Sequence, residues 1–217
     1  METRFILASR SPRKRDLLGL VVPADRIVVV PPREANEAGF EGLHELGAIE
    51  GRLAEIARTK LEDVVDQLTS SECLIVPGQP QIVIAADTTI VATDCDGILQ
   101  VIGQPPEGDD WKEAVRRWFR DCFAGRTHLA LTVLCVRAPD GRAAERLTKT
   151  EVAFIADVEK NLEWYIDTGE PRGKAGGYAI QGAGSIFVSH VTGSLSNVIG
   201  LPLEALLSAF EELGPFR

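Results

Sequence analysis

The run IVIAADTTIVA, residues 82–92, carries the strongest structural signal in the chain. Its apolar parts, 82–86 and 90–92, predict strand-like runs on either side of the polar triplet Asp87-Thr88-Thr89. An ionised carboxylate inside such a run is costly unless it is paired, hydrogen-bonded or bound to a metal ion. We therefore expect Asp87 to have a partner. Either it caps a bend through neighbouring N–H groups, or it belongs to a functional site.

Strand and helix patterns alternate on both sides of this run. A short buried strand at 5–8 leads directly into a helix that begins at Ser11-Pro12, where serine suits the N-cap and proline the first turn. Apolar residues keep helical spacing from 46 to 68. The other expected strands are 27–30, 129–136, 150–155 and 185–191, and the other expected helices are 111–123, 158–167 and one from about 202 onward.

Two hairpins connect neighbouring strands. Gly97 turns the chain after the 82–92 run, and Pro139-Asp140-Gly141 joins the strands at 129–136 and 150–155. Hairpin partners are antiparallel, whereas strands joined through a helix can be parallel. We therefore expect an α/β fold with a mixed twisted sheet flanked by helices, formed by a single domain over residues 1–217.

Charge and composition argue against several classes of protein. The net charge is −9, from 32 Asp and Glu against 23 Lys and Arg, so binding to a nucleic-acid polymer would act against an adverse field. The four cysteines form no C-x-x-C pair and no zinc-finger spacing, which predicts reduced thiols. No apolar stretch approaches the ~20 residues that span a bilayer. We expect a cytoplasmic protein without a membrane partner.

Basic residues crowd the start of the first predicted helix. Arg10, Arg13, Lys14 and Arg15 lie where the helix dipole is positive and disfavours each cation by ~0.3–1 kcal/mol. A bound phosphate would reverse this effect, because exposed N–H groups and basic side chains would converge on it. The alternative is a solvated basic helix start. We favour phosphate, since violations of a local rule tend to mark functional sites.

Two further lysines are candidates for the same site. At 100° per residue, Lys60 falls inside the apolar arc of the 46–68 helix, so its amine points toward the core or into a cleft. It either extends along the edge of the core or serves a site. The glycine-rich stretch at 174–184 can bring its backbone and Lys174 close to a ligand, although such loops more often only connect elements.

Glu34 and Asp87 are the candidates for a metal site. Mg²⁺ and Mn²⁺ are hard cations that take one or two carboxylates together with phosphate oxygens. If the two acids lie close together, they could hold such an ion, and one of them could activate water. The three histidines show no spacing typical of a catalytic triad or a metal site, and we interpret them as structural.

The chain resembles the Maf (septum formation) family of nucleotide pyrophosphatases over nearly its whole length. Four segments carry the resemblance, in the family's order: ILASRSPRKRDLL (6–18), IVIAADTTIVA (82–92), GEPRGKAGGYAIQG (169–182) and GSLSNVIGLPL (193–203). Several matches in one order make coincidence improbable. The resemblance implies a fold like that of inosine triphosphate pyrophosphatases, with a cleft between two lobes. It also implies hydrolysis of dTTP, UTP or modified relatives to the monophosphate and pyrophosphate.

The resemblance also assigns roles to residues. Asp87 corresponds to the proton acceptor and metal ligand, and Glu34 to a second carboxylate at the Mg²⁺ or Mn²⁺ ion. Where the 7-methyl-GTP/CTP branch of the family has SPW, SDQ and SEG, this chain has SPR, ADT and IQG, as in the dTTP/UTP branch. With the lysines above, the expected substrate-binding residues are Ser9, Arg13, Lys14, Lys60, Thr88, Lys174 and Gln181.

One position departs from the family pattern. The family usually reads GKP where this chain has Gly103-Gln104-Pro105, and glutamine can donate a hydrogen bond but cannot neutralise a phosphate. We therefore expect weaker triphosphate binding or slower turnover. Two alternatives stay open, a nucleotide-binding regulator of cell division with little catalysis and an inosine/xanthosine triphosphate pyrophosphatase. A homodimer is a further expectation from the family.

Overall fold

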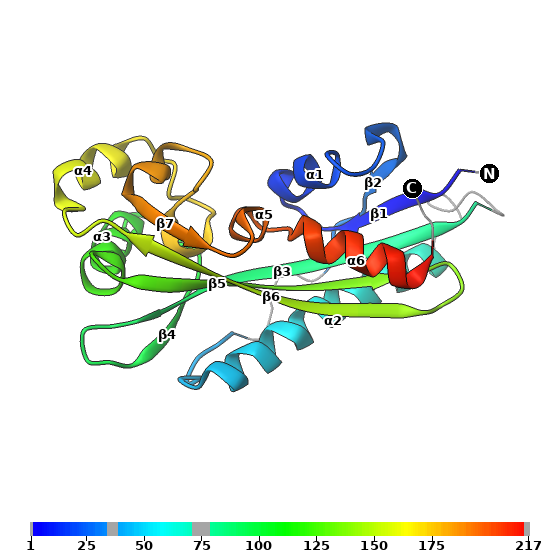
Figure 1. The fold of residues 1–217 in the computed structure, drawn as a ribbon, viewed down its shortest axis with the longest axis horizontal. Coiled ribbons are helices and arrows are strands. Elements are labelled where there is room, and N and C mark those ends of the chain that lie inside the picture. Colours follow the sequence, from blue (N-terminus) through cyan, green and yellow to red (C-terminus); the bar gives the residue numbers. More distant parts are fainter. Residues whose placement is uncertain (1, 34–38, 71–78, 215–217) are drawn as a thin grey trace.

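The computed structural model describes residues 2–33, 39–70 and 79–214, which form a seven-stranded mixed sheet with helices on both faces (Figure 1). The strands are β1 (Arg4–Ala8), β2 (Ile27–Val29), β3 (Gln81–Thr93), β4 (Leu99–Ile102), β5 (Thr127–Arg137), β6 (Ala143–Phe154) and β7 (Val188–Thr192). The α-helices are α1 (Pro12–Leu18), α2 (Leu46–Ser70), α3 (Trp111–Trp118), α4 (Glu159–Asp167), α5 (Leu195–Ile199) and α6 (Leu203–Leu213). The expected α/β fold with a mixed sheet is confirmed.

Strand β3 is the central strand of the sheet and pairs with three other strands. The order is β2-β1-β3-β5-β6-β7, and β4 also pairs with β3. β1 and β2 are parallel to their neighbours, whereas β4 to β7 join as antiparallel strands. The two strand-like runs expected at 82–86 and 90–92 are one continuous strand, because β5 pairs with β3 without interruption from Val83 to Val91. The polar triplet therefore lies inside the sheet and does not bend the chain.

The two faces of the sheet bury three apolar clusters. Odd-numbered residues of β3 such as Val83 and Val91 face α2, whose apolar stripe covers that side. Even-numbered residues divide between two clusters on the opposite face. Ile84 packs with α1 and α6, and Ile90 packs with α3 and α4. The sheet is thus shared by two lobes on one face, as the expected fold requires, and they are separated at residues 86–90 of β3.

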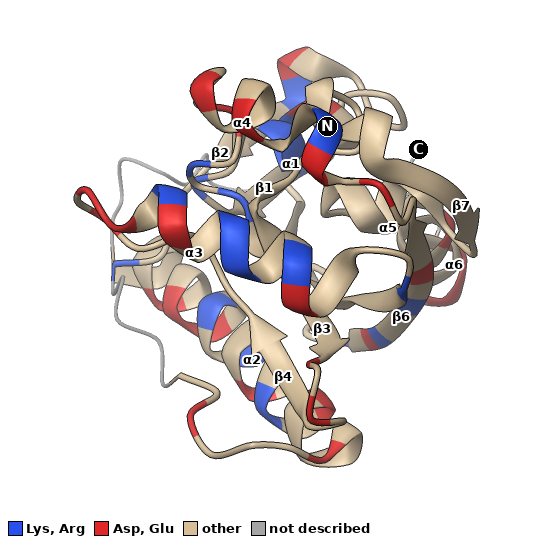
Figure 2. Cartoon of the chain, turned by 90° about the vertical axis from the view of Figure 1, so that its left-hand side faces the viewer, with Lys and Arg blue, Asp and Glu red and all other residues tan. Residues whose placement is uncertain are grey.

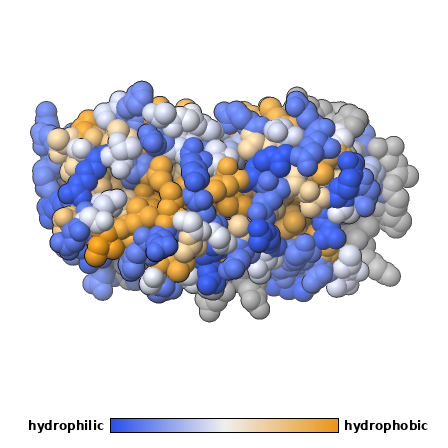
Figure 3. Space-filling view, turned by 60° about the horizontal axis from the view of Figure 1, so that its bottom comes forward, coloured by the Kyte–Doolittle hydropathy of each residue, from blue (hydrophilic) through white to orange (hydrophobic). Residues whose placement is uncertain are grey.

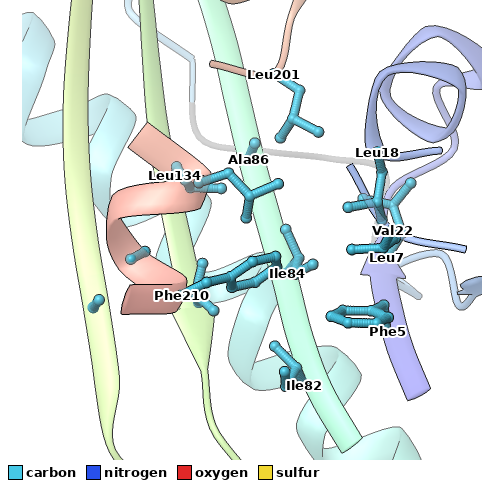
Figure 4. Packing of buried hydrophobic residues seen from close by; sticks show 14 of the residues in the cluster. Phe5, Leu7, Leu18, Val22, Ile82, Ile84, Ala86, Leu134, Leu201 and Phe210 are labelled. Atoms are coloured by element: carbon cyan, nitrogen blue, oxygen red, sulfur yellow. The ribbon is translucent and has the colours of Figure 1, made fainter. Parts of the chain in front are cut away.

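The first lobe surrounds the parallel end of the sheet. Figure 4 shows Phe210 of α6 over Ile84, with Phe5 of β1 beside it. The rings of Phe5 and Phe210 lie 5.7 Å apart between centroids. Leu18 at the end of α1 is fully buried in the same cluster. This packing fixes α1 directly after β1, and so fixes the basic turn that begins α1.

The second lobe is built around aromatic rings. Phe119, in the π-helical turn that continues α3, contacts Phe123, Phe154, Tyr165 and Phe187 with centroid distances of 5.0–5.8 Å. Edge-to-face and tilted pairs of this kind add to the stabilisation that comes from buried area. The cluster holds the end of α4, and with it the start of the loop at 169–184, against β5 and β6.

Some expected elements have different limits. The expected strand at 185–191 is wrong at its start, because residues 183–187 form a 3₁₀ turn and β7 begins at Val188. The expected strand at 150–155 begins earlier, at Ala143, because pairing with β5 extends it to the hairpin turn. The short helix α5 was not expected. It has five residues, which is too few for a helical periodicity.

The molecular surface carries charged side chains on its helices and an apolar area on one face. Figure 2 shows Lys or Arg beside Asp or Glu on α2 and α3. Some of these are exposed pairs between α3 and α4, such as Arg116 with Glu163 at 2.7 Å, and pairs of this kind add little stability. Figure 3 shows hydrophobic side chains gathered on the face that carries α2 and β4.

Among the described helices, none is both long and apolar enough to cross a bilayer. The described cysteines, Cys95, Cys122 and Cys135, are free thiols.

We predict that Phe119→Ala lowers the free energy of unfolding by about 3–5 kcal/mol, because it leaves a cavity among four rings. Urea unfolding followed by circular dichroism measures the change. The control is Leu20→Ala, since Leu20 is 73% exposed and its truncation should cost less than about 0.5 kcal/mol. Equal effects of the two substitutions would contradict the central place of Phe119.

We also predict a pH effect from His128, which is buried and bonds to the Tyr178 hydroxyl at 2.8 Å. Burial lowers the pKa of His128 to about 3. Since the unfolded chain takes up a proton below about pH 6.5, this group makes stability fall with decreasing pH, by up to about 1.4 kcal/mol per pH unit between about 6.5 and 3. Above that window the effect is absent. The difference in unfolding free energy between the wild type and His128→Gln, measured from pH 7.5 to 4.5, isolates it, and a constant difference would contradict it.

Candidate active site

The candidate site lies at a gap in the pairing of β3. One edge of β3 pairs with β5 throughout the site region. The other edge pairs with β1 up to Ala85 and with β4 from Ile90 onward. Between these points, residues 86–89 have no strand neighbour on that edge among the described residues. In an open α/β sheet, ligands bind where neighbouring strands diverge in this way.

A cavity of about 630 Å³ opens at this gap. Its wall comes from the turn after β1, from α2, β3 and the segment after β4, from the loop at 173–181 and from the end of α5. The expected site residues that line it are Ser9, Arg13, Lys14, Lys60, Asp87, Thr88, Lys174 and Gln181. Glu34 lies outside the described residues. Segments that are far apart in the sequence therefore share one cavity, which receives residues from both lobes.

Asp87 has the partner that its position requires. Its Oδ1 accepts a hydrogen bond from Lys60 Nζ, and the Asp87 and Lys60 side chains are only 15% and 18% exposed. Asp87 is odd-numbered in β3 and so faces α2, on which Lys60 lies. The interpretation of Asp87 as the cap of a bend is wrong, because the strand runs straight through it. The ion pair fixes a carboxylate at the wall of the cavity.

Thr88 and Lys14 lie on the opposite face of the sheet. Lys14 Nζ donates to the carbonyl oxygen of Ala86 at 2.9 Å and reaches Thr88 Oγ1 at 3.5 Å. The side chain is 8% exposed. Lys14 therefore donates a hydrogen bond to the edge of β3 just beyond the last residue that pairs with β1. In the structure this ammonium group contacts the backbone of β3, although Lys14 also lines the cavity, where it was expected to bind substrate.

Two cations of the cavity lie close enough to disfavour each other. Burial lowers the pKa of Arg13. Burial lowers the pKa of Lys174 as well, and the positive charge of Arg13 lowers it further. Lys174 Nζ donates to the carbonyl oxygen of Glu170 at 2.6 Å. An anion between Arg13 and Lys174 would relieve both their repulsion and their loss of hydration.

Glu170 shapes the glycine-rich loop, and sequence reasoning did not find it. Its carboxylate accepts hydrogen bonds from the backbone N–H groups of Ala183 and Gly184 at 2.8 and 2.9 Å. A Cβ atom at Gly182 would lie 2.3 Å from this carboxylate, so a side chain there would push the carboxylate away from its present position. The Glu170 carboxylate thus holds the part of the loop that follows Gln181. The motif GEP contained the signal, but a structural role for its glutamate follows only from the contacts.

Gln104 and Glu107 also line the cavity. Gln104 is neutral, so it brings no positive charge to this wall. Glu107 was not among the expected residues, and it adds an acidic group to the same opening. Both side chains are exposed. The cavity is therefore less positive at the segment after β4 than at the turn after β1.

The described acids provide a partial set of metal ligands. No group of three or more His, Cys, Asp or Glu side chains lies together within 2–33, 39–70 and 79–214. A dedicated protein cage for a metal ion is thus not formed by these residues. One carboxylate such as Asp87 would nevertheless fit Mg²⁺ if a bound substrate supplied phosphate oxygens, because this ion is commonly bound by one or two carboxylates and the substrate.

Comparison with known proteins gives the family. The family model described as Maf-like protein matches residues 4–213. This chain belongs to the Maf family. A curated dTTP/UTP pyrophosphatase of Anaeromyxobacter dehalogenans is 35% identical over 217 residues, which cover 99% of the Maf chain described here and 96% of the relative.

Other Maf relatives have similar coverage. Curated dTTP/UTP pyrophosphatases of Shewanella denitrificans and Pyrococcus furiosus are 35% and 31% identical, over 96% of this chain in each case and over 96% and 94% of their own lengths. A solved structure titled nucleoside-triphosphatase / dITP/XTP pyrophosphatase from Mycobacterium abscessus covers 70% of this chain and 73% of its own, with a TM-score of 0.37 and 14% identity. The family resemblance expected from the four motifs is confirmed.

We predict that Gln104→Lys tightens the binding of inorganic tripolyphosphate about threefold to tenfold, because it returns a cation to the cavity wall. Isothermal titration calorimetry at two salt concentrations measures the change, which should be larger at low salt. Thr192→Lys adds the same charge on β7, outside the cavity, and is the matched control. If both substitutions change the affinity equally, the effect comes from net charge and the prediction is wrong.

Proposed function

We propose that this chain is a nucleoside triphosphate pyrophosphatase that hydrolyses dTTP and UTP to the monophosphate and pyrophosphate. The observation that supports this most directly is the joining of the Asp87–Lys60 pair with Arg13 and Lys174 in one cavity at the gap in β3. A carboxylate beside several cations suits a polyphosphate that is attacked by water. The names of the curated relatives point to the same reaction in those proteins.

In this proposal the triphosphate lies against the basic side of the cavity. Arg13 and Lys174 neutralise phosphate oxygens, and Ser9 and the turn after β1 supply further hydrogen-bonding groups there. The base lies toward the more apolar wall, which includes Ile90, Tyr178 and Val198, with Thr88 and Gln181 at its edges. Both ends of the nucleotide would thus be placed before the reaction begins.

Asp87 acts as the general base. It accepts a proton from the attacking water while the water oxygen forms a bond to the α-phosphorus. The bond between the α-phosphorus and the oxygen that bridges it to the β-phosphorus breaks, and pyrophosphate leaves with that oxygen. Lys60 holds Asp87 in position through their hydrogen bond. Arg13 and Lys174 offset the charge that develops on the leaving group.

A divalent cation completes the proposed site. Mg²⁺ or Mn²⁺ would be held by Asp87 and phosphate oxygens, and Glu34, which lies outside the described residues, is the second acid proposed for it. When bound, the ion would neutralise phosphate charge and polarise the bond that is broken.

A product assay tests the proposed reaction. The protein is incubated with dTTP, UTP, CTP, GTP and ITP and with Mg²⁺, Mn²⁺ or EDTA, and products are identified by chromatography and ³¹P NMR. We expect monophosphate and pyrophosphate from dTTP and UTP, and no turnover with EDTA. Diphosphate and orthophosphate would contradict the proposed bond cleavage. Nucleotide binding without product in any metal would favour the regulator, and a preference for ITP would favour the purine enzyme.

We predict that Asp87→Asn lowers kcat at least 100-fold, since it removes the proton acceptor but keeps the size of the side chain, and general bases contribute about 10²–10⁴-fold. Steady-state turnover of dTTP measures the change, and circular dichroism checks the fold. Asp167→Asn is the control, because Asp167 is exposed on α4 and lies outside the cavity. Residual activity above one tenth in Asp87→Asn would exclude Asp87 as the base.

A further inference from the structure

A row of threonines crosses the sheet between the two apolar clusters. Thr88 of β3 pairs in register with Thr132 of β5, and Thr132 pairs with Thr148 of β6. Thr150 lies two residues further along β6 on the same face. On β3 the apolar residues Ala86 and Ile90 flank this row, and they belong to different clusters. The row therefore marks the joint between the lobes and begins at the cavity.

The first two residues of this row, Thr88 and Thr132, are joined through their hydroxyl groups. Thr88 Oγ1 and Thr132 Oγ1 lie 2.9 Å apart. Thr132 Oγ1 also lies 3.5 Å from the carbonyl oxygen of Asn197 in α5, a contact that is longer than an ordinary O–H···O hydrogen bond. Thr132 and Asn197 are both fully buried. These contacts thus connect Thr88, the residue after Asp87, with α5.

Asn197 fixes α5 on the sheet through the two N–H groups of its side-chain amide. Its Nδ2 donates to Ala130 O and Thr150 Oγ1 at 2.9 Å each and reaches Thr148 O at 3.4 Å. Thr150 Oγ1 in turn donates to the carbonyl oxygen of Ser194 at 3.1 Å. Because a buried donor is costly when it lacks a partner, these bonds hold α5 against β5 and β6.

The residue that follows α5 contacts β3, the strand that carries Asp87. Gly200, directly after α5, has a φ of 130°, and its carbonyl oxygen accepts a bond from Thr88 Oγ1 at 3.2 Å. A Cβ atom at Gly200 would lie 3.6 Å from Lys14 Cε and 3.8 Å from Thr88 Oγ1. Thr88 is thus held by Lys14, Thr132 and Gly200 within the part of β3 that has no strand partner on one edge among the described segments.

We propose that Thr132 and Asn197 are positioning residues for the proposed hydrolysis. They fix Thr88 and the end of α5, and through them the backbone of β3 beside Asp87. The effect on turnover that we expect rests on the proposed function. Neither residue lines the cavity, so neither is placed to bind substrate. Their effect must therefore pass through the position of the strand, and a small displacement of a reacting group can cost about 100-fold in rate.

Thr132→Val tests the proposal, because valine has nearly the shape of threonine but no hydroxyl group. We expect kcat for dTTP to fall about tenfold per folded enzyme, while KM changes less than about threefold, since the residues that contact the phosphates stay in place. Thr132→Ser restores the hydroxyl and should recover kcat to within about threefold of the wild type. The control is Val136→Ala, which removes buried atoms from the same strand without touching the hydroxyl row.

Hydrogen exchange measured by mass spectrometry gives a readout that does not need turnover. Amides at 86–89 should exchange about tenfold faster in Thr132→Val than in the wild type, and not in Val136→Ala at equal global stability. Unchanged exchange, or a fall in kcat shared equally by Val136→Ala, would overturn the proposal. If the wild type shows no turnover, the proposed function fails, and the exchange result alone decides the positioning role. Should Thr132→Val not fold, Thr132→Cys is measured in the same way.

Discussion

The structure depends on one interrupted line of hydrogen bonds along an edge of β3. β1 pairs with that edge up to Ala85 and β4 pairs with it from Ile90, so a few peptide groups between them are left to other partners. Backbone groups in a protein interior must be satisfied, and here Lys14 supplies a donor to Ala86. The same interruption leaves room for a cavity. Uninterrupted pairing with β5 along the other edge of β3 keeps the gap fixed in space.

The gap places two kinds of chemistry on two faces of one strand. Because side chains alternate along a strand, Asp87 faces α2 and meets Lys60, whereas Thr88 faces α1 and α5. The acid pair and the threonine row are therefore neighbours in sequence but are supported by different parts of the fold. Within the proposed reaction, this arrangement separates the group that accepts a proton from the groups that hold its strand.

The two lobes contribute unequally to the cavity. The lobe with α1 supplies Arg13 through a short turn after a buried strand, and its position follows from tight packing around Phe5 and Leu18. The lobe with α3 and α4 supplies Lys174 on a loop whose shape depends on Glu170 and on glycines that leave space. Burial and the positive charge of Arg13 lower the pKa of Lys174, and a bound anion would offset both effects.

The sequence by itself determined the alternation of strands and helices, the mixed sheet and the family, because apolar periodicity and ordered motifs are local properties of the chain. It also singled out Asp87, since a carboxylate within an apolar run needs a partner. Only the tertiary structure decided that Lys60 is that partner, that Lys14 bonds to the backbone of β3, and that Glu170, Thr132 and Asn197 support the cavity. These contacts join residues 13 to 72 positions apart, and such pairings depend on strand register and helix placement, which no local pattern encodes.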